Sequence, residues 1–312
     1  MKLLLTGATG FVGGALQQRI VADDCYDLTV AVRRVADLPG AVQIGNIDAQ
    51  TDWTVALQGV DVVIHSAARA HILVESSANP LIEFRKINVD GTVALAQQAL
   101  AAGVKRFVFI SSIGVNGVST GAQPFTESNT PAPHTAYAIS KLEAEVALQE
   151  LCAGSTMQLV VIRPPLVYAA HAPGNFARLL KFVSLGLPLP FALVKNQRSM
   201  IALENMVDFV LCCVKHPQAA NQVFLIADQQ PISTPQMLRY LAHGMGKRAW
   251  SLPVPVSLLW MMARIFGREA LFNQLCGSLV IDTSKAQHLL GWTPPVATEQ
   301  AIYKAAQAYM AK

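Results

Sequence analysis

The chain has 312 residues, a formal net charge of +4 and 14% charged residues. This length suits one large α/β domain or two unequal ones. The basic residues are scattered, so the charge pattern excludes an electrostatic footprint for nucleic acid. The 5 cysteines show neither metal-ligand nor disulfide spacing, which indicates a reduced compartment and no metal site.

Strand-like apolar runs alternate with helical patterns through the first half of the chain. Strands are predicted at residues 2–6, 28–32, 61–65, 106–111 and 158–163, and helices at 11–21, 81–102 and 135–153. Near-continuous Val, Ile, Leu and Phe runs are typical of parallel strands covered on both faces. The pattern predicts a doubly wound, parallel α/β sheet with its ligand at the carboxyl ends of the strands.

Glycines follow the first strand at Gly7, Gly10 and Gly13, and a helix-forming run comes directly after them. Glycine permits a tight turn, close approach of the backbone to a pyrophosphate and close packing of helix on strand. The helix start adds free N–H groups and a positive dipole end. The loop therefore predicts dinucleotide binding, and the alternative is an ordinary strand–helix turn.

The composition of the sequence changes after Arg163-Pro164-Pro165, where prolines become frequent and apolar runs become short. We expect a dinucleotide-binding domain over residues 1–168. Residues 169–312 are expected to form mainly a smaller substrate-binding lobe, with some segments returning to the first domain.

Two features bear on localisation. Met1-Lys2 leads directly into a strand-like run, which predicts the absence of a signal peptide and a cytoplasmic protein. The apolar segment 253–267 contains Arg264 and is too short to span a bilayer. We expect a core or substrate-lobe helix there, and the alternative is a surface helix lying near membrane-bound partners.

Tyr137 and Lys141 stand four residues apart in a predicted helix, so their side chains share one face. A nearby ammonium favours the phenolate, and a pKa lowered by about three units represents roughly 4 kcal/mol. The pair therefore predicts a proton shuttle for an alcohol and its ketone. The alternative is an exposed tyrosine and lysine without a shared role.

Several motifs fall in a fixed order along the chain. They are the glycine loop at residues 6–13, Ala67-Ala68, Asn88, Ser111-Ser112 and Tyr137-x-x-x-Lys141. Together they resemble the extended short-chain dehydrogenases/reductases of the NAD-dependent epimerase/dehydratase family, across essentially the whole chain. The resemblance implies a Rossmann domain, a smaller C-terminal substrate lobe and nucleotide-sugar chemistry.

The same resemblance assigns roles to single residues. Ser112 would hydrogen-bond the reacting oxygen, Tyr137 would carry the proton, and Lys141 would tune Tyr137 and bind the nicotinamide ribose. The implied cofactor-binding residues are Gly7, Thr9, Gly10, Phe11, Val12, Gly13, Arg33, Arg34, Asn46, Ile47, Ala67, Ala68, Asn88, Tyr137, Lys141, Pro164 and Val167. The implied substrate-binding residues are Ser112, Asn175 and Arg198.

The cofactor prediction turns on Arg33-Arg34 at the end of the second strand, where NAD-preferring relatives carry an acid. Guanidinium groups suit a 2′-phosphate. We therefore expect NADP or NAD as cofactor, with NADPH favoured, and the alternative is that both arginines are ordinary surface cations.

The reaction prediction turns on Ile113-Gly114, which occupy the positions where the family's 4,6-dehydratases carry Asp-Glu. Neither side chain can move a proton, which disfavours dehydration. The leading hypothesis is an NAD(P)H-dependent reductase of a UDP-4-keto-6-deoxy-N-acetylhexosamine. The alternative is a UDP-glucose or UDP-N-acetylglucosamine 4-epimerase that retains NAD, and a non-catalytic cofactor-sensing scaffold stays as a third reading.

A homodimer is also expected. The helices predicted at 81–102 and 135–153 match those that commonly form a four-helix bundle in this family. Five small residues would allow close helix approach, namely Ala94, Ala96, Ala99, Ala144 and Ala147.

Overall fold

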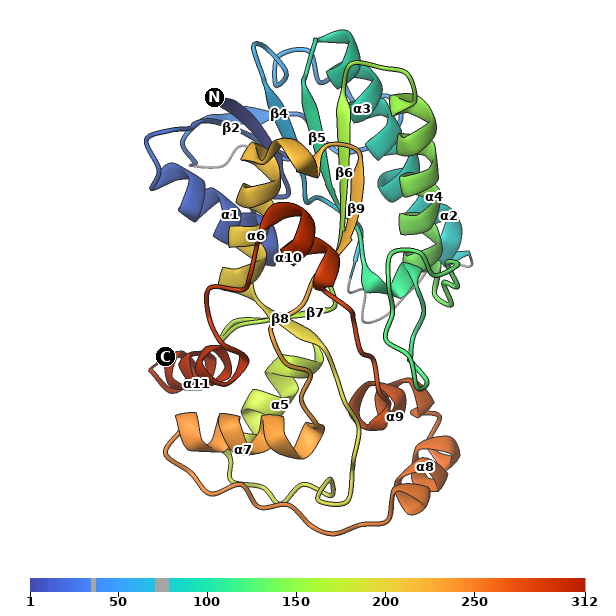
Figure 1. The fold of residues 1–312 in the computed structure, drawn as a ribbon, viewed down its shortest axis with the longest axis vertical. Coiled ribbons are helices and arrows are strands. Elements are labelled where there is room, and N and C mark those ends of the chain that lie inside the picture. Colours follow the sequence, from blue (N-terminus) through green and yellow to red (C-terminus); the bar gives the residue numbers. More distant parts are fainter. Residues whose placement is uncertain (35–37, 71–78, 312) are drawn as a thin grey trace.

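A parallel sheet forms the upper half of the molecule, with helices on both of its faces (Figure 1). The computed structural model describes residues 1–34, 38–70 and 79–311. Within them the sheet has seven strands in the order β3-β2-β1-β4-β5-β6-β9. The strands are β1 (Lys2–Thr6), β2 (Asp27–Val32), β3 (Ala41–Gln43), β4 (Val62–His65), β5 (Arg106–Ile110), β6 (Gln158–Arg163) and β9 (Gln222–Leu225). The predicted doubly wound α/β sheet is confirmed.

The helices cover the sheet in two layers. One layer holds α1 (Phe11–Val21), α6 (Leu203–Lys215) and α10 (Ser284–Leu290). The other holds α2 (Pro80–Arg85), α3 (Gly91–Ala101) and α4 (Ala136–Cys152). A π-helical turn, Lys86–Asp90, joins α2 to α3, so the helix expected at 81–102 is interrupted.

Strand β1 lies at the centre of the sheet, paired with β2 on one side and β4 on the other. Leu3, Leu4 and Leu5 are fully buried because their side chains alternate between two covered faces. The strand order reverses beside β1, and ligands bind outside the carboxyl ends of the strands at such a point.

A smaller lobe forms the lower half of Figure 1. It contains β7 (Leu166–Tyr168), β8 (Met200–Ala202), α5 (Asn175–Ser184), α7 (Thr234–Gly244), α8 (Val256–Ile265), α9 (Glu269–Cys276) and α11 (Thr298–Met310). Its own core includes Phe176, Leu241 and Ile302. Although β9, α6 and α10 follow residue 168, they pack in the upper sheet and its helix layer.

Asp228 joins the small lobe to the end of β9. Its buried carboxylate accepts hydrogen bonds from the Tyr168 hydroxyl (2.6 Å) and from the Asn205 amide (2.7 Å). The backbone N–H of Ala202 donates to it as well. These donors satisfy a carboxylate that would otherwise be costly to bury.

Two expectations about surfaces can be compared with the structure. Among the described helices, none is long and apolar enough to cross a membrane. Ala94, Ala96, Ala99 and Ala144 are buried within the single chain. The expectation that these four residues supply a surface for a second copy is therefore wrong. Their small size instead lets α3 and α4 pack closely within the protomer.

Candidate active site

The glycine loop closes tightly on the strand beside it. Gly7 has a φ of +76°, and a Cβ there would lie 2.7 Å from the backbone nitrogen of Ala67. A Cβ on Gly13 would lie 2.1 Å from the Gly7 carbonyl oxygen. Helix α1 begins with neither a side-chain cap nor an acid in its first turn. Its free N–H groups and positive dipole end fit a pyrophosphate, with Thr9 and Gly10 exposed at this turn.

A buried histidine holds this loop from beneath. His65, at the end of β4, hydrogen-bonds Thr6 Oγ1 (2.8 Å) through Nδ1 and Thr92 Oγ1 (2.9 Å) through Nε2. Thr6 Oγ1 also accepts a hydrogen bond from the Ala67 N–H (3.1 Å). Three segments far apart in sequence thus meet under the loop, and the sequence analysis missed this because no local motif marks it.

His65 makes the fold sensitive to acid. Burial lowers the pKa of His65 from its usual 6.5 to about 3, and the charge on Lys141 adds to the effect. Between pH 6.5 and 3 the unfolded chain binds the proton and the folded chain does not. The free energy of unfolding therefore falls as pH falls through this window, by roughly 4–5 kcal/mol for this group. Urea unfolding of the wild type and of His65→Gln at several pH values measures it.

The variant should show a shallower dependence of unfolding free energy on pH than the wild type, whatever its stability at pH 7. His134→Gln, at an exposed position, serves as the matched control and should keep the wild-type slope. Equal slopes for wild type and His65→Gln would show that the buried imidazole does not set acid stability.

Tyr137 and Lys141 occupy the first two turns of α4, which starts after the N-cap Thr135. Lys141 is 1% exposed, and its Nζ lies 4.0 Å from the centre of the Phe109 ring on β5. In the part of the chain that the structure describes, no hydrogen bond or ion pair holds this ammonium. Tyr137 is half-buried, with its ring centre 6.1 Å from that of Phe84. The predicted shared face is confirmed by helix geometry.

The expected lowering of the tyrosine pKa is wrong for the polypeptide alone. Burial raises the pKa of Tyr137 to about 12 and lowers the pKa of Lys141 to about 7, with Glu145 partly opposing the second shift. Desolvation is the main cause of both shifts, because burial disfavours the charged form of each group. Lys141 is thus poised to lose or gain charge near neutral pH.

Ser112 follows β5, and its hydroxyl accepts a hydrogen bond from the Gly114 N–H (3.1 Å). A Cβ on Gly114 would lie 3.3 Å from both Ser112 Oγ and the Ala138 Cβ. Ala138 belongs to the first turn of α4, so Ser112 lies near the start of that helix; a shared site for Ser112 and Tyr137 stays a prediction. The buried Ile113 and the close-packed Gly114 offer no proton carrier, which supports the exclusion of dehydration.

Asn88 lies in the π-helical turn and is 1% exposed. Its Oδ1 accepts from the Arg69 N–H (2.8 Å), while its Nδ2 donates to the Arg69 carbonyl (3.1 Å) and to Ser140 Oγ (2.9 Å). Ser140 in turn donates to the Tyr137 carbonyl (2.8 Å). Asn88 therefore positions α4 against the loop after β4, and its cofactor contact stays a prediction.

A buried ion pair lies one turn beyond Lys141. Arg163 of β6 and Glu145 of α4 are 2.5 Å apart, and Arg163 also donates to Asn116 Oδ1 (2.9 Å). The Ser111 hydroxyl donates to the same Glu145 carboxylate, so Ser111 belongs to this network. Sequence reasoning missed the pair because its members are 18 residues apart, on different elements.

Most of the remaining predicted cofactor residues follow the carboxyl ends of the parallel strands, which form one edge of the sheet. Arg33 and Arg34 are exposed directly after β2, and residues 35–37 beside them lie outside the described residues. Pro164 follows β6 and is buried, with its carbonyl accepting from the Ile113 N–H (2.9 Å). The others at or near this edge are the exposed Asn46 and the partly buried Phe11, Val12, Ile47, Ala67, Ala68 and Val167.

The two predicted substrate residues of the lobe both contact α9 or the residue that follows it. The Asn175 amide donates to Gln274 Oε1. Arg198 donates from Nη1 to the carbonyls of Asn273 (3.2 Å) and Gly277 (3.1 Å), and burial lowers the pKa of its guanidinium. Both residues thus donate hydrogen bonds to the α9 segment, and their contact with a substrate stays a prediction.

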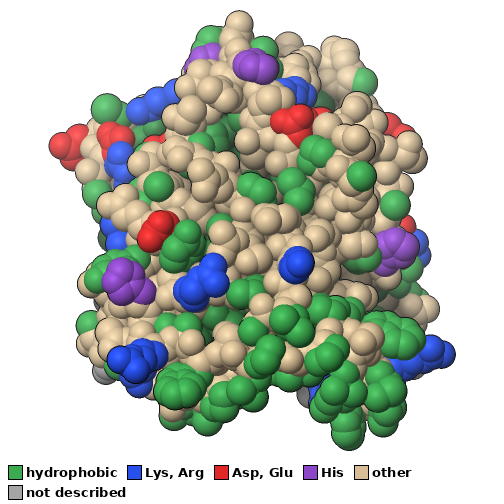
Figure 2. Space-filling view, turned by 60° about the horizontal axis from the view of Figure 1, so that its bottom comes forward, with side chains coloured by type: hydrophobic (Ala, Val, Ile, Leu, Met, Phe, Trp, Pro, Cys, Tyr) green, Lys and Arg blue, Asp and Glu red, His purple; other side chains and the backbone are tan. Residues whose placement is uncertain are grey.

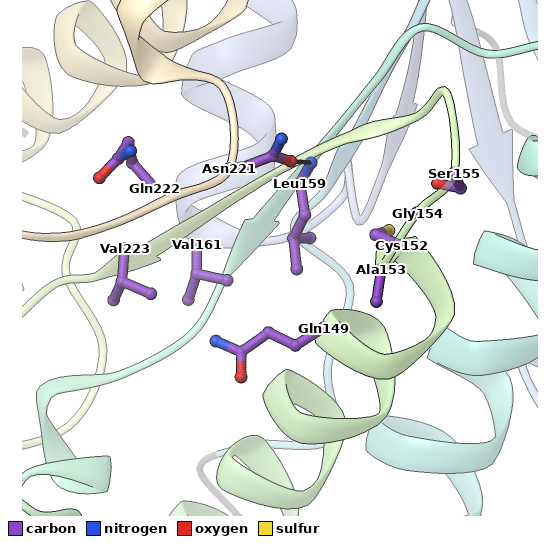
Figure 3. A pocket seen from close by; sticks show the side chains of 10 residues that line it. All are labelled: Gln149, Cys152, Ala153, Gly154, Ser155, Leu159, Val161, Asn221, Gln222 and Val223. Carbon is purple, nitrogen blue, oxygen red and sulfur yellow. Dashed lines mark hydrogen bonds between the residues drawn. The ribbon is translucent and has the colours of Figure 1, made fainter.

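A hollow of about 250 Å³ lies elsewhere, at the amino ends of β6 and β9 (Figure 3). Gln149 and Cys152 of α4 border it, and the Asn221 side chain accepts from the Leu159 N–H (3.0 Å) at its rim. Helix α4 has 17 residues, so this end lies about 20 Å from Tyr137. The hollow is separate from the candidate active site.

The geometry and the comparisons now agree on a family. Residues 3–227 match the NAD dependent epimerase/dehydratase family. A UDP-glucose 4-epimerase of Vibrio cholerae is 41% identical over 99% of this chain and 95% of its own length. The chain belongs to the NAD-dependent epimerase/dehydratase family, within the extended short-chain dehydrogenases/reductases, and is an enzyme of that family. The predicted family is confirmed.

More distant relatives share the whole length. The N-acetyl-alpha-D-glucosaminyl-diphospho-ditrans,octacis-undecaprenol 4-epimerase of Escherichia coli O157:H7 is 26% identical over 98% of this chain and 94% of its own. Among solved structures, the UDP-glucuronic acid 4-epimerase from Bacillus cereus in complex with NAD superimposes with a TM-score of 0.79. It is 21% identical, with 100% of this chain and 99% of that one covered. That structure shares the fold.

Proposed function

We propose that this enzyme is an NAD-dependent 4-epimerase of a UDP-hexose. The observation that carries the proposal is the 41% identity of this chain to a UDP-glucose 4-epimerase. The predicted residues Ser112, Tyr137 and Lys141, which follow β5 or stand at the start of α4, support it. The sequence analysis placed a keto-sugar reductase first and this epimerase second. The relatives named for 4-epimerisation favour the reverse order.

Each catalytic residue has a separate task in this proposal. A bound NAD, held by the glycine loop, would supply reversible hydride transfer at the sugar C4, with oxidation on one face and reduction on the other. Tyr137 would take the proton from the 4-hydroxyl and later give it back. Ser112 would hold the same oxygen by a hydrogen bond. The charge of Lys141 would favour the phenolate and offset the burial that opposes it.

The substrate carrier is a second part of the proposal. Arg198 and Asn175 would bind a diphosphate, because a guanidinium and an amide N–H group both suit phosphate oxygens. The Vibrio relative is named for UDP-glucose and the Escherichia relative for a sugar linked to diphospho-undecaprenol. Both named substrates contain a diphosphate. The Vibrio relative, at 41% identity, favours the UDP-sugar over the lipid-linked form.

A keto-sugar reductase remains the second candidate, because Arg33 and Arg34 stand exposed after β2 with no acid between strand and arginines. Exchangeable NADPH would suit a reductase better than an epimerase. We expect the double substitution Arg33→Ala and Arg34→Ala to weaken NADP binding about tenfold or more and to leave NAD binding within about twofold. Titration calorimetry with each dinucleotide measures this, and Arg19→Ala is the control. Equal losses for both dinucleotides would rule out 2′-phosphate recognition by these arginines.

The deciding experiment is an assay of the purified protein with UDP-glucose, followed by proton nuclear magnetic resonance of the anomeric signals. Appearance of UDP-galactose without added reductant is the expected result. Stoichiometric oxidation of NADPH with a UDP-4-keto-6-deoxy-N-acetylhexosamine, and no interconversion, would overturn the epimerase proposal in favour of the reductase.

We also propose a homodimer, formed through the outer faces of α2 and α4. Ile82 and Val146 are exposed apolar side chains on these helices. Sedimentation equilibrium should report a dimer, and a monomer at micromolar concentration would contradict it.

A further inference from the structure

Helix α8 is apolar on nearly all sides yet buries none of its ten residues. A helix that is hydrophobic all round is normally enclosed by protein or lipid. Six exposed side chains form what we call the basal patch: Trp250, Trp260, Met261, Met262, Ile265 and Phe266. Ile265 and Phe266 are each 70% exposed. Of the placements expected for residues 253–267, a core helix is wrong because α8 buries no residue, whereas a substrate-lobe helix and the surface-helix alternative both fit.

The basal patch continues onto a neighbouring segment. The Leu189 N–H donates to the Trp250 carbonyl (2.9 Å), and the Leu252 N–H donates to the Leu189 carbonyl (2.8 Å). Leu185 and Leu187, just before this pairing, are also exposed. Figure 2 shows hydrophobic side chains gathered along the bottom of the molecule, so the surface is larger than scattered single residues would produce.

The charged residues of the segments that form and flank the basal patch are mostly basic, with Glu269 at the start of α9 as an acidic exception. Residues 171–203 contain four Lys or Arg and no Asp or Glu, and residues 229–268 contain five and none. Lys181, Lys247, Arg248, Arg264 and Arg268 are exposed. The whole chain carries a net charge of only +4, so the positive charge is concentrated in this lobe.

We propose that the basal patch docks this protein on the surface of an anionic lipid bilayer, without spanning it. Apolar side chains flanked by Lys and Arg, with Trp among them, are the composition of interfacial helices. The cations would meet the lipid headgroups while Trp, Ile and Phe side chains enter the acyl boundary. Charge complementarity favours this occupant over a second copy of the chain, because two copies of this basic surface would repel each other.

Docking would place the substrate side of the lobe near the membrane. Helix α8 packs on α9, and α9 contacts Asn175 and Arg198. The docking does not depend on the epimerase proposal, since binding to vesicles is measured without any sugar.

The tryptophans provide the probe. Trp250 and Trp260 are 62% and 45% exposed, whereas Trp53 and Trp292 are 0% and 7% exposed. Full-length protein is mixed with phosphatidylcholine vesicles that contain or lack phosphatidylglycerol. We expect co-sedimentation with the anionic vesicles, a shift of tryptophan emission to shorter wavelength, and quenching by brominated acyl chains. Trp250→Phe with Trp260→Phe should remove the shift and the quenching while vesicle binding persists.

Charge and position are tested by matched variants. Arg264→Gln and Arg268→Gln should each weaken binding to anionic vesicles about fivefold, since each such cation contributes about 1 kcal/mol near an anionic surface. Arg19→Gln and Val55→Ser, exposed and outside this lobe, should leave binding unchanged. Absence of vesicle binding would overturn the proposal. So would binding without a spectral shift, or vesicle-free self-association that Trp260→Ser abolishes.

Discussion

Replacing Tyr137 by Phe is expected to lower kcat by about 10²–10⁴, because it removes the proton carrier and little else. The ring sits half-buried near Phe84, so the phenylalanine ring can occupy the same place. The fold and the binding of NAD should therefore be unchanged. Steady-state epimerase assays, together with circular dichroism and dinucleotide titration, measure the three quantities separately.

The control is Tyr303→Phe on α11, a partly buried tyrosine whose ring packs near His243. It loses the same hydroxyl outside the candidate active site and should keep wild-type turnover. Turnover of Tyr137→Phe within about tenfold of the wild type would mean that another group moves the proton. Persistent cellular function without any turnover would instead favour a cofactor-sensing scaffold.

Local sequence patterns predict the parts of this fold that local chemistry controls. The five predicted strands and the glycine loop could be predicted because each is specified by contiguous residues, such as Leu3-Leu4-Leu5. Strand β3 escaped prediction because it spans only three residues, and β9 because it lies after residue 168, where the short apolar runs predicted no strand. The prediction of one continuous helix at 81–102 misses the π-helical turn, in which the buried Asn88 amide donates to Ser140, 52 residues away.

The candidate site divides in the same way. Tyr137 and Lys141 stand out because helical spacing alone puts them together. The groups beneath them, His65, Glu145 and Arg163, have partners 18 to 59 residues distant, and no short pattern reveals such pairs. The core position predicted for helix α8 is wrong for a different reason. Its sequence states that the helix is apolar, but only the structure shows that the rest of the chain leaves it uncovered.

Replacing Arg163 by Met is expected to lower the free energy of unfolding by about 3–5 kcal/mol, because it leaves a buried, uncompensated carboxylate on Glu145. The pair is nearly inaccessible, with side-chain exposures of 6% and 1%. Removing both charges, in Arg163→Met with Glu145→Gln, should restore part of the loss. Urea unfolding of the single and double variants gives the coupling free energy directly.

Helix α4 supplies its own control for this prediction. Glu143, two residues before Glu145, pairs with Arg85 at the same 2.5 Å, but these side chains are 32% and 46% exposed. Solvent screens an exposed pair, so Arg85→Met should cost far less stability than Arg163→Met. The two substitutions differ in burial and not in distance. A similar cost for both would show that the Arg163–Glu145 network is not what anchors α4, and with it Lys141, to the sheet.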